Sequence, residues 1–405
     1  MTLPESSTSS VPSAEPLNTA EPSSEKRTRQ TIVDQADVWV IKVGSRALTT
    51  PESQLDLKQI ENLSNQLVDL VERGKQVMLV SSGAVASGVG RLGLPGRPRD
   101  LATVQAVAAV GQAYLIQVYE ECLTHRGHHA GQVLLTASDL DDRVRYLNVR
   151  NTLHSLHKLG AIPIINENDT VAVDELKTTF GDNDRLAAMV AGLFAKSILV
   201  ILSDVRGLYD RDPVDPNAQV IHTISKVDST VEDLVRDRKT GVSKGGMASK
   251  LSAAKFVTGS GQGVIIAWGR EQRVLPRLAA GELLGSLFLP QDKMLTPKQR
   301  WIGFSAQCLG TILIDAGASK AMLDQGKSLL PIGIREVKGD FEKGDPVSIC
   351  NIEGLELARG QSNYSAADAR KISGCRSDRI EEILGVCTYE EVVHRDNLVL
   401  VRGRG

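Results

Sequence analysis

Several short segments of this 405-residue chain gather glycine, lysine, hydroxyl or acidic residues. Glycine lets a backbone approach an anion closely, and a lysine ammonium group neutralises oxyanion charge. Such residues at the ends of strands are typical of a phosphate-binding site. The segments are Ile41–Ser45, Ser81–Ala84, Ile165–Asp169, Gly181–Asp184, Leu202–Asp204 and Gly241–Lys250.

The first two segments each belong to the end of an apolar run. Lys42 lies near the end of one run and is soon followed by Gly44. We interpret it as a phosphate ligand, and an ordinary surface lysine is the alternative. Ser82 stands between a second run and a stretch of small residues that predicts a helix. Hydroxyls and backbone amides at a helix N-terminus form an anion site, although N-capping by Ser82 explains the same pattern.

Acids and amides gather in the next two segments. Ile165–Asp169 ends a third apolar run, and Gly181–Asp184 follows shortly after it. So many polar groups beside an apolar strand need partners, such as an ammonium group, a metal or helix donors. Turn formation and N-capping are the alternative for Gly181–Asp184.

The last segment, Gly241–Lys250, holds two consecutive glycines between two lysines, just before a helical pattern. It predicts a mobile loop that reaches over a nucleotide, and a surface loop without a ligand is the alternative. The sequence contains no G-x-x-x-x-G-K-[ST] loop, and Gly88–Gly93, which has the G-x-G-x-x-G spacing, does not lie between a strand and its helix. Any phosphoryl transfer therefore uses another architecture.

Strands must position these segments, because short apolar runs alternate with amphipathic stretches from residue 37 onward. Helices are predicted around Leu57–Leu70, Val104–Cys122 and Asn148–Leu159, where apolar residues recur every three or four positions. This alternation predicts the α/β class, with a mainly parallel open sheet sandwiched by helices. Ligands of such sheets bind at the carboxyl ends of the strands. The predicted strands are Val38–Val43, Val77–Val80, Gln132–Leu135, Ile162–Ile165, Ile198–Leu202 and Val264–Ala267.

The composition divides the chain further. Residues 1–36 are rich in proline and serine and predict a disordered tail, because they bury too little apolar surface to offset the entropy of ordering. We expect a catalytic domain over 37–290, a linker over 291–298, a small β-rich domain over 299–385 and a terminal segment over 386–405. The strands expected in the small domain are Gly310–Asp315, Leu329–Val337, Pro346–Cys350 and Glu356–Gly360.

The overall charge and the cysteines exclude several classes of protein. Lysine and arginine number 47 against 49 acids, a formal charge of −2, which excludes a polybasic nucleic-acid coat and an acidic solvating tail. No apolar run approaches the length of about 18 residues that a membrane span needs. Five cysteines without a C-x-x-C unit argue against a disulfide framework or a zinc ribbon. We expect a cytoplasmic protein with reduced thiols and no membrane partner.

Taken in order, these motifs resemble the amino-acid kinase family, in the branch that acts on glutamate. The resemblance runs from about Trp39 to Arg395, and the region that opens at Lys298–Ile302 resembles a PUA domain. The chain departs from the family in its long N-terminal tail, in Ser203 where threonine is expected and in Lys244 where a small hydroxyl residue is common. The motifs are Lys42–Ser45, Ser82–Ala84, Ala109–Gln112, Ile165–Asp169, Gly181–Asp184 and Gly245–Met247.

The resemblance implies transfer of the ATP γ-phosphoryl group to the side-chain carboxylate of L-glutamate. The product, L-glutamyl 5-phosphate, belongs to the first step of proline biosynthesis. A carboxylate nucleophile is already ionised at neutral pH, since its ordinary pKa is about 4.3, so no general base is required. Mg²⁺ is expected to be carried mainly by the ATP phosphates.

The resemblance also implies a role for each motif residue. Lys42 and Lys250 would flank the transferred phosphoryl group, with Asp182 and Asp184 supporting them as catalytic residues. Glutamate would be held by Ser82, Asp169 and Asn183. ATP would be held by Lys42, Ser203, Asp204, Lys244, Gly245, Gly246, Met247, Ala248, Ser249 and Lys250.

Partners and rival functions follow from the same resemblance. Proline is the expected feedback inhibitor, the chain is expected to form a homo-oligomer, and its product is expected to pass to a glutamyl phosphate reductase. An acetylglutamate or uridylate kinase of the same fold is the nearest rival. RNA binding through the PUA-like domain is the alternative of another class, but residues 296–405 hold 15 basic and 15 acidic residues. The neutral sum favours no nucleic-acid partner.

Overall fold

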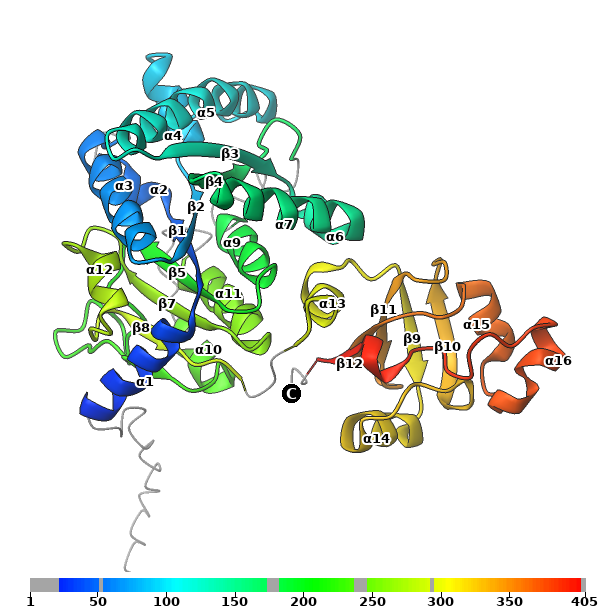
Figure 1. The fold of residues 1–405 in the computed structure, drawn as a ribbon. Coiled ribbons are helices and arrows are strands. Elements are labelled where there is room, and N and C mark those ends of the chain that lie inside the picture. The colour runs from blue at the N-terminus through cyan, green and yellow to red at the C-terminus, as the bar shows by residue number, and fades with distance from the viewer. Residues whose placement is uncertain (1–21, 51–53, 173–181, 237–245, 292–294, 402–405) are drawn as a thin grey trace, which may run out of the picture.

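The computed structural model describes residues 22–50, 54–172, 182–236, 246–291 and 295–401. The predicted ATP ligands Lys244 and Gly245 lie outside these ranges, as do Gly181 and residues 1–21. Asp182 is described in its backbone only. The described chain forms a larger unit around one wide sheet and a smaller unit around a second sheet, joined by a short helical segment (Figure 1).

The larger unit is built on a sheet of eight strands, as the repeated strand and helix patterns predict. All neighbouring strands run parallel except β7 and β8, which are antiparallel. All six predicted strands are confirmed, and β6 and β8 are additional. In spatial order the strands are β3 (His129–Leu135), β4 (Ala161–Glu167), β2 (Gln76–Ser81), β1 (Val38–Val43), β5 (Ser197–Ser203), β7 (Gly263–Trp268), β8 (Ser286–Phe288) and β6 (Thr223–Ile224).

Each face of this sheet is covered by helices, because the side chains of a buried strand alternate between two apolar cores. Val38 and Val40 of β1 belong to one cluster of buried residues. Trp39 and Ile41 belong to the other. The first cluster is covered by α6 (Ala137–Asp141), α7 (Arg143–Lys158), α9 (Asp182–Gly192), α10 (Ser229–Arg236) and α11 (Met247–Gly259). The second is covered by α2 (Ser45–Leu48), α3 (Leu57–Glu72), α5 (Leu101–Thr124) and α12 (Val274–Ala279), and α4 (Ala84–Arg91) packs on α5.

Helix α5 is the one helix of the described residues that is long and apolar enough to cross a membrane. It lies instead within the larger unit, where Val107, Leu115 and Tyr119 are buried. Its neighbours are α3, α4 and β3. Its apolar composition is therefore that of a core helix.

The prediction of a disordered tail through residue 36 is wrong for its second part. Residues Pro22–Gln35 form helix α1, and Arg29 within it is fully buried. The Arg29 guanidinium donates to the carbonyls of His222 at 2.9 Å and Glu282 at 3.0 Å, and also to that of Leu284. Composition missed this helix because its order depends on contacts with residues about two hundred positions away.

The smaller unit holds a five-stranded sheet in the order β10-β9-β11-β12-β13. The four predicted strands are confirmed, although the second begins later than expected, at Ile334. The strands are β9 (Gly310–Ile314), β10 (Ile334–Gly339), β11 (Pro346–Cys350), β12 (Glu356–Gln361) and β13 (Leu398–Leu400), with α14 (Ala316–Gln325), α15 (Ala366–Ile372) and α16 (Ile380–Leu384) around them. Helix α13 (Pro297–Arg300) and the π-helical turn η1 (Trp301–Ser305) connect the two units.

Candidate active site

The candidate site lies where neighbouring parallel strands end at the same edge of the large sheet. Val43, at the end of β1, is paired with Ser81 of β2 and with Leu202 of β5. The motifs that follow these strands therefore begin at one level. The N-terminus of α9 also reaches this edge, because Asn183 bonds to residues at the end of β2.

Asp184, in the first turn of α9, lies between two lysines from distant parts of the chain. Its Oδ1 is 2.7 Å from Lys42 Nζ, and its Oδ2 is 3.6 Å from Lys250 Nζ. Ser249 Oγ donates to the same Oδ2 at 3.0 Å. We call Lys42, Asp184 and Lys250 the lysine–aspartate cluster. With two ammonium groups and one carboxylate it has a net positive charge, which suits an anionic ligand.

Burial explains why the positive charge of the lysine–aspartate cluster would attract an anion. Lys42 is only 7 % exposed and Asp184 only 1 %, so the alternative of a surface lysine is wrong. Burial lowers the pKa of Lys42, Asp184 opposes that shift, and the neighbouring Lys250 adds to it. A phosphate at this position would replace the lost solvation of both ammonium groups.

A second charged pair lies at the ends of β1 and β5. Arg46 Nη1 is 2.9 Å from Asp204 Oδ2, and Ser203 Oγ donates to Asp204 Oδ1 at 3.1 Å. Partial burial works to raise the pKa of Asp204, but the hydrogen bonds from Arg46 and Ser203 outweigh it and lower the pKa. Arg46 was not among the predicted site residues, although its position directly after the Lys42–Ser45 motif was a signal that could have identified it.

Neutral side chains form a separate network beside the lysine–aspartate cluster. Asn183 Nδ2 lies 2.8 Å from Ser82 Oγ and 3.1 Å from Asn166 Oδ1. Asn166 Nδ2 in turn donates to Gln112 Oε1 at 2.7 Å. We call Ser82, Asn183, Asn166 and Gln112 the amide chain. Within the described chain, the buried atoms Asn183 Oδ1 and Gln112 Nε2 have no hydrogen-bond partner, so one acceptor and one donor remain for a ligand.

Glycines at α4 and α5 position two members of the amide chain. Gly83 has φ +108° and is the N-cap of α4, with no side-chain cap, so the alternative of N-capping by Ser82 is wrong. A Cβ on Gly111 would lie 1.8 Å from the carbonyl oxygen of Ala84. Only glycine permits this approach of α4 to α5, and it places Gln112 next to the end of β4.

The remaining predicted residues are placed as follows. Asp169 is half-buried in the turn after β4. Gly246 is the N-cap of α11, and Met247 and Ala248 begin that helix. The described part of the Gly241–Lys250 segment is thus the N-terminus of a helix whose Ser249 and Lys250 reach Asp184.

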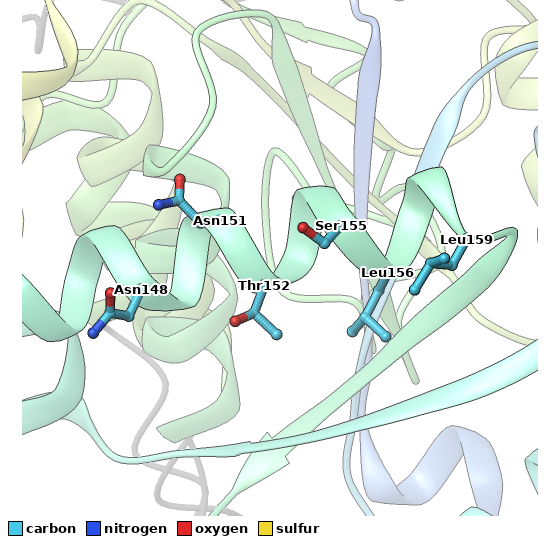
Figure 2. A pocket seen from close by; sticks show the side chains of 6 residues that line it. All are labelled: Asn148, Asn151, Thr152, Ser155, Leu156 and Leu159. Carbon is cyan, nitrogen blue, oxygen red and sulfur yellow. The ribbon is translucent and has the colours of Figure 1, made fainter.

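A shallow pocket lies elsewhere, along the outer face of α7. Figure 2 shows that the side chains lining it project from this helix and from its C-cap residue, Leu159. None of them belongs to the lysine–aspartate cluster or the amide chain. They are Asn148, Asn151, Thr152, Ser155, Leu156 and Leu159.

Comparison with known proteins identifies the family. The amino acid kinase family model matches residues 37–267, and the PUA domain model matches residues 310–384. A glutamate 5-kinase of Rhodopirellula baltica is 48% identical over 384 residues, covering 95% of this chain and 99% of that protein. A glutamate 5-kinase of Syntrophus aciditrophicus is 45% identical over 375 residues, covering 92% of this chain and 97% of that protein.

Among solved structures, carbamate kinase from Giardia lamblia bound to AMP-PNP is 16% identical, with a TM-score of 0.45 over 63% of this chain and 99% of that chain. The family model spans more than half of this sequence. The two glutamate 5-kinases match this chain over nearly their whole length. This chain therefore belongs to the amino acid kinase family, among relatives that are glutamate 5-kinases, and carries a C-terminal PUA domain.

Proposed function

We propose that this chain transfers the γ-phosphoryl group of ATP to the side-chain carboxylate of L-glutamate, giving L-glutamyl 5-phosphate for proline biosynthesis. The observation that carries the proposal is the pair of buried lysines, Lys42 and Lys250, on either side of Asp184. A cationic site for a phosphoryl group thus lies directly beside the polar amide chain, which suits an amino acid.

The lysine–aspartate cluster acts by positioning and by charge. A γ-carboxylate oxygen of glutamate forms a bond to the γ-phosphorus while the bond from that phosphorus to the β–γ bridging oxygen breaks, and ADP leaves with the electron pair. Lys42 and Lys250 neutralise the negative charge on the oxygens of the phosphoryl group during its transfer. Asp184 holds the two ammonium groups apart at fixed positions. Because the nucleophile is already ionised, no proton has to be removed.

The amide chain recognises glutamate in this proposal. Asn183 Nδ2 donates to Ser82 Oγ at the end of β2, and Oδ1 of the same amide is a buried acceptor that a substrate ammonium group would satisfy. Asp169, in the turn after β4, supplies the carboxylate for the same ammonium group. Its role stays a prediction from the motif.

ATP is proposed to bind at the N-terminus of α11 and at the end of β5. The first backbone amides of a helix have no acceptor within it and bind phosphate, and α11 begins at Met247. Ser203 and Asp204 lie at the end of β5 on the same edge of the sheet. Lys244 and Gly245 are proposed to belong to this ATP site from the motif alone.

Mg²⁺ is proposed to enter with the nucleotide. Among the described residues, no group of three histidine, cysteine, aspartate or glutamate side chains lies close enough together to hold a metal. Mg²⁺ does not need such a group, because it is usually bound by substrate phosphates together with one or two carboxylates. Asp204 and Asp184 are the described carboxylates at the proposed ATP site, and Asp182 is the third candidate from the motif.

The reaction can be tested by trapping its product. The full chain is incubated with ATP, Mg²⁺ and hydroxylamine, which converts an acyl phosphate to a hydroxamate. We expect hydroxamate with L-glutamate and none with N-acetyl-L-glutamate, and no ADP formation with UMP. Hydroxamate from N-acetyl-L-glutamate alone, or ADP formation with UMP alone, would contradict the proposal.

Three further partners and the location belong to the same proposal. Proline is proposed to inhibit the reaction, the chain is proposed to form a homo-oligomer, and a glutamyl phosphate reductase is proposed to receive the unstable product. Location in the cytoplasm is proposed from the reduced cysteines and the metabolic role. Addition of proline to the hydroxamate assay tests the first of these.

A further inference from the structure

Helix α9 connects the candidate active site to the segment before the PUA domain. Its 11 residues, Asp182–Gly192, span about 16 Å at 1.5 Å per residue. Asn183 and Asp184 stand at its N-terminal end, within the amide chain and the lysine–aspartate cluster. The opposite end of the helix is therefore a place from which the site can be adjusted.

At that opposite end, one carbonyl is held by two side chains. The Gly192 carbonyl oxygen accepts from Arg300 Nε at 2.8 Å and from Tyr146 Oη at 3.3 Å. Arg300 is only 2 % exposed, and its Nη1 also donates to the carbonyl of Leu295 at 2.7 Å. A guanidinium at this end is favourable because the C-terminus of a helix carries partial negative charge.

Aromatic contacts fix the segment that carries Arg300. Trp301 Nε1 donates to the carbonyl of Asp141 at 3.2 Å. The Arg143 guanidinium lies 5.2 Å from the ring centre of Tyr146 and 5.3 Å from that of Trp301, as in cation–π pairs. Arg300 itself lies in neither of the matched family regions, 37–267 and 310–384.

We propose that Arg300 is a positioning residue for phosphoryl transfer. By holding Gly192 it fixes α9 along its axis, and so fixes the position of Asp184 between Lys42 and Lys250. A displacement of about 1 Å at a catalytic group is enough to slow a reaction strongly. This inference rests on the proposed function, since its readout is phosphoryl transfer, and it adds a residue more than one hundred positions away in sequence.

The test is a comparison of purified full-length variants in the hydroxamate assay, with rates divided by the folded fraction. Arg300→Met removes the charge and both hydrogen bonds while keeping most of the volume. We expect kcat to fall about tenfold, with the KM for ATP within about twofold of the wild type. Arg300→Lys keeps a charge and a donor, and we expect it to recover most of this loss.

A matched control is Arg335→Met, which changes an exposed arginine of the smaller unit that pairs with Asp315. It should leave kcat unchanged. Wild-type kcat in folded Arg300→Met, even with a lower melting temperature, would show a structural role only and overturn the inference.

If Arg300→Met does not fold, Tyr146→Phe decides the matter. Tyr146→Phe removes only the hydroxyl that donates to Gly192, and a fall in kcat of about two- to threefold at constant KM for ATP supports the inference. Wild-type kcat in Tyr146→Phe overturns it. A wild-type chain that forms no hydroxamate contradicts the proposed function and this inference together, whereas an active wild type with unchanged variants contradicts the inference alone.

Discussion

Two consecutive residues at the start of α9 enter two different networks. Asp184 lies between the ammonium groups of Lys42 and Lys250. Asn183 bonds to Ser82 and Asn166 through neutral groups. The helix thus places a charged region and an uncharged region side by side, and in the proposed function the first binds the phosphoryl group and the second binds the amino acid.

Burial requires each network to replace the solvation that its polar groups lose. A buried ion pair gains stability only if its attraction and hydrogen bonds offset the loss of solvation. Asp184 meets this demand with two lysines and the Ser249 hydroxyl. The amide chain meets its own demand by passing hydrogen bonds from one amide to the next, and within the described residues Asn183 Oδ1 keeps no partner.

The largest effect is expected from the charged network. Lys42→Met should reduce kcat about 1,000-fold, because the interaction with the negative charge of the phosphoryl group in the transition state is lost. The KM for glutamate should change less than about threefold. Steady-state hydroxamate kinetics measure both. The control is Lys196→Met, which changes an exposed lysine that pairs with Asp37 and directly precedes β5. Wild-type kcat in Lys42→Met would show that Lys42 has no part in the mechanism.

An intermediate effect is expected from the amide chain. Asn183→Ala should raise the KM for glutamate about 10- to 100-fold, since a polar contact to the substrate disappears and Ser82 and Asn166 lose a partner. The KM for ATP should stay within about twofold. Asn151→Ala on the outer face of α7 is the matched control. A selective rise in the KM for ATP instead would reverse the assignment of the two networks.

The smallest effect concerns the second charged pair and its pH dependence. Because the hydrogen bonds to Asp204 lower its pKa, the ionised carboxylate adds stability above its ordinary pKa of about 3.9, and this stability is lost as the pH falls through the lower folded-state pKa.

Ser203→Ala removes one of these hydrogen bonds, so the gain in stability from about pH 3 to pH 7 should shrink, by less than about 1 kcal/mol at this partly exposed group. Urea unfolding at the two pH values measures it, with Ser252→Ala on α11 as control. An unchanged difference would show that Ser203 does not act on Asp204.

The sequence predicts the central strands well, because each is a buried apolar run bounded by polar or glycine-containing segments. It could not predict β6 and β8, which are two and three residues long and exist through pairing with each other and with β7. Helix α1 was out of reach for a related reason. Its order depends on Arg29 meeting carbonyls near residue 284, which local composition does not report.

The site residues likewise divide into those that the sequence predicted and those that only the fold reveals. Lys42, Lys250 and Asn183 were predicted from their motifs, and the structure brings them together. The resemblance implied the same supporting role for Asp182 and Asp184, and the structure places Asp184 against the two lysines. Gln112 was part of a motif to which no role was given, because its bond to Asn166 joins helix α5 to strand β4, which only the fold makes neighbours.

The division between the two networks is tested most directly by binding, without turnover. Isothermal titration calorimetry would measure L-glutamate and AMP-PNP separately against the wild type, Lys42→Met and Asn183→Ala. We predict that Lys42→Met binds glutamate within about threefold of the wild type, whereas Asn183→Ala loses at least about tenfold in glutamate affinity and keeps that for AMP-PNP. Equal losses of glutamate affinity in both variants would contradict the account.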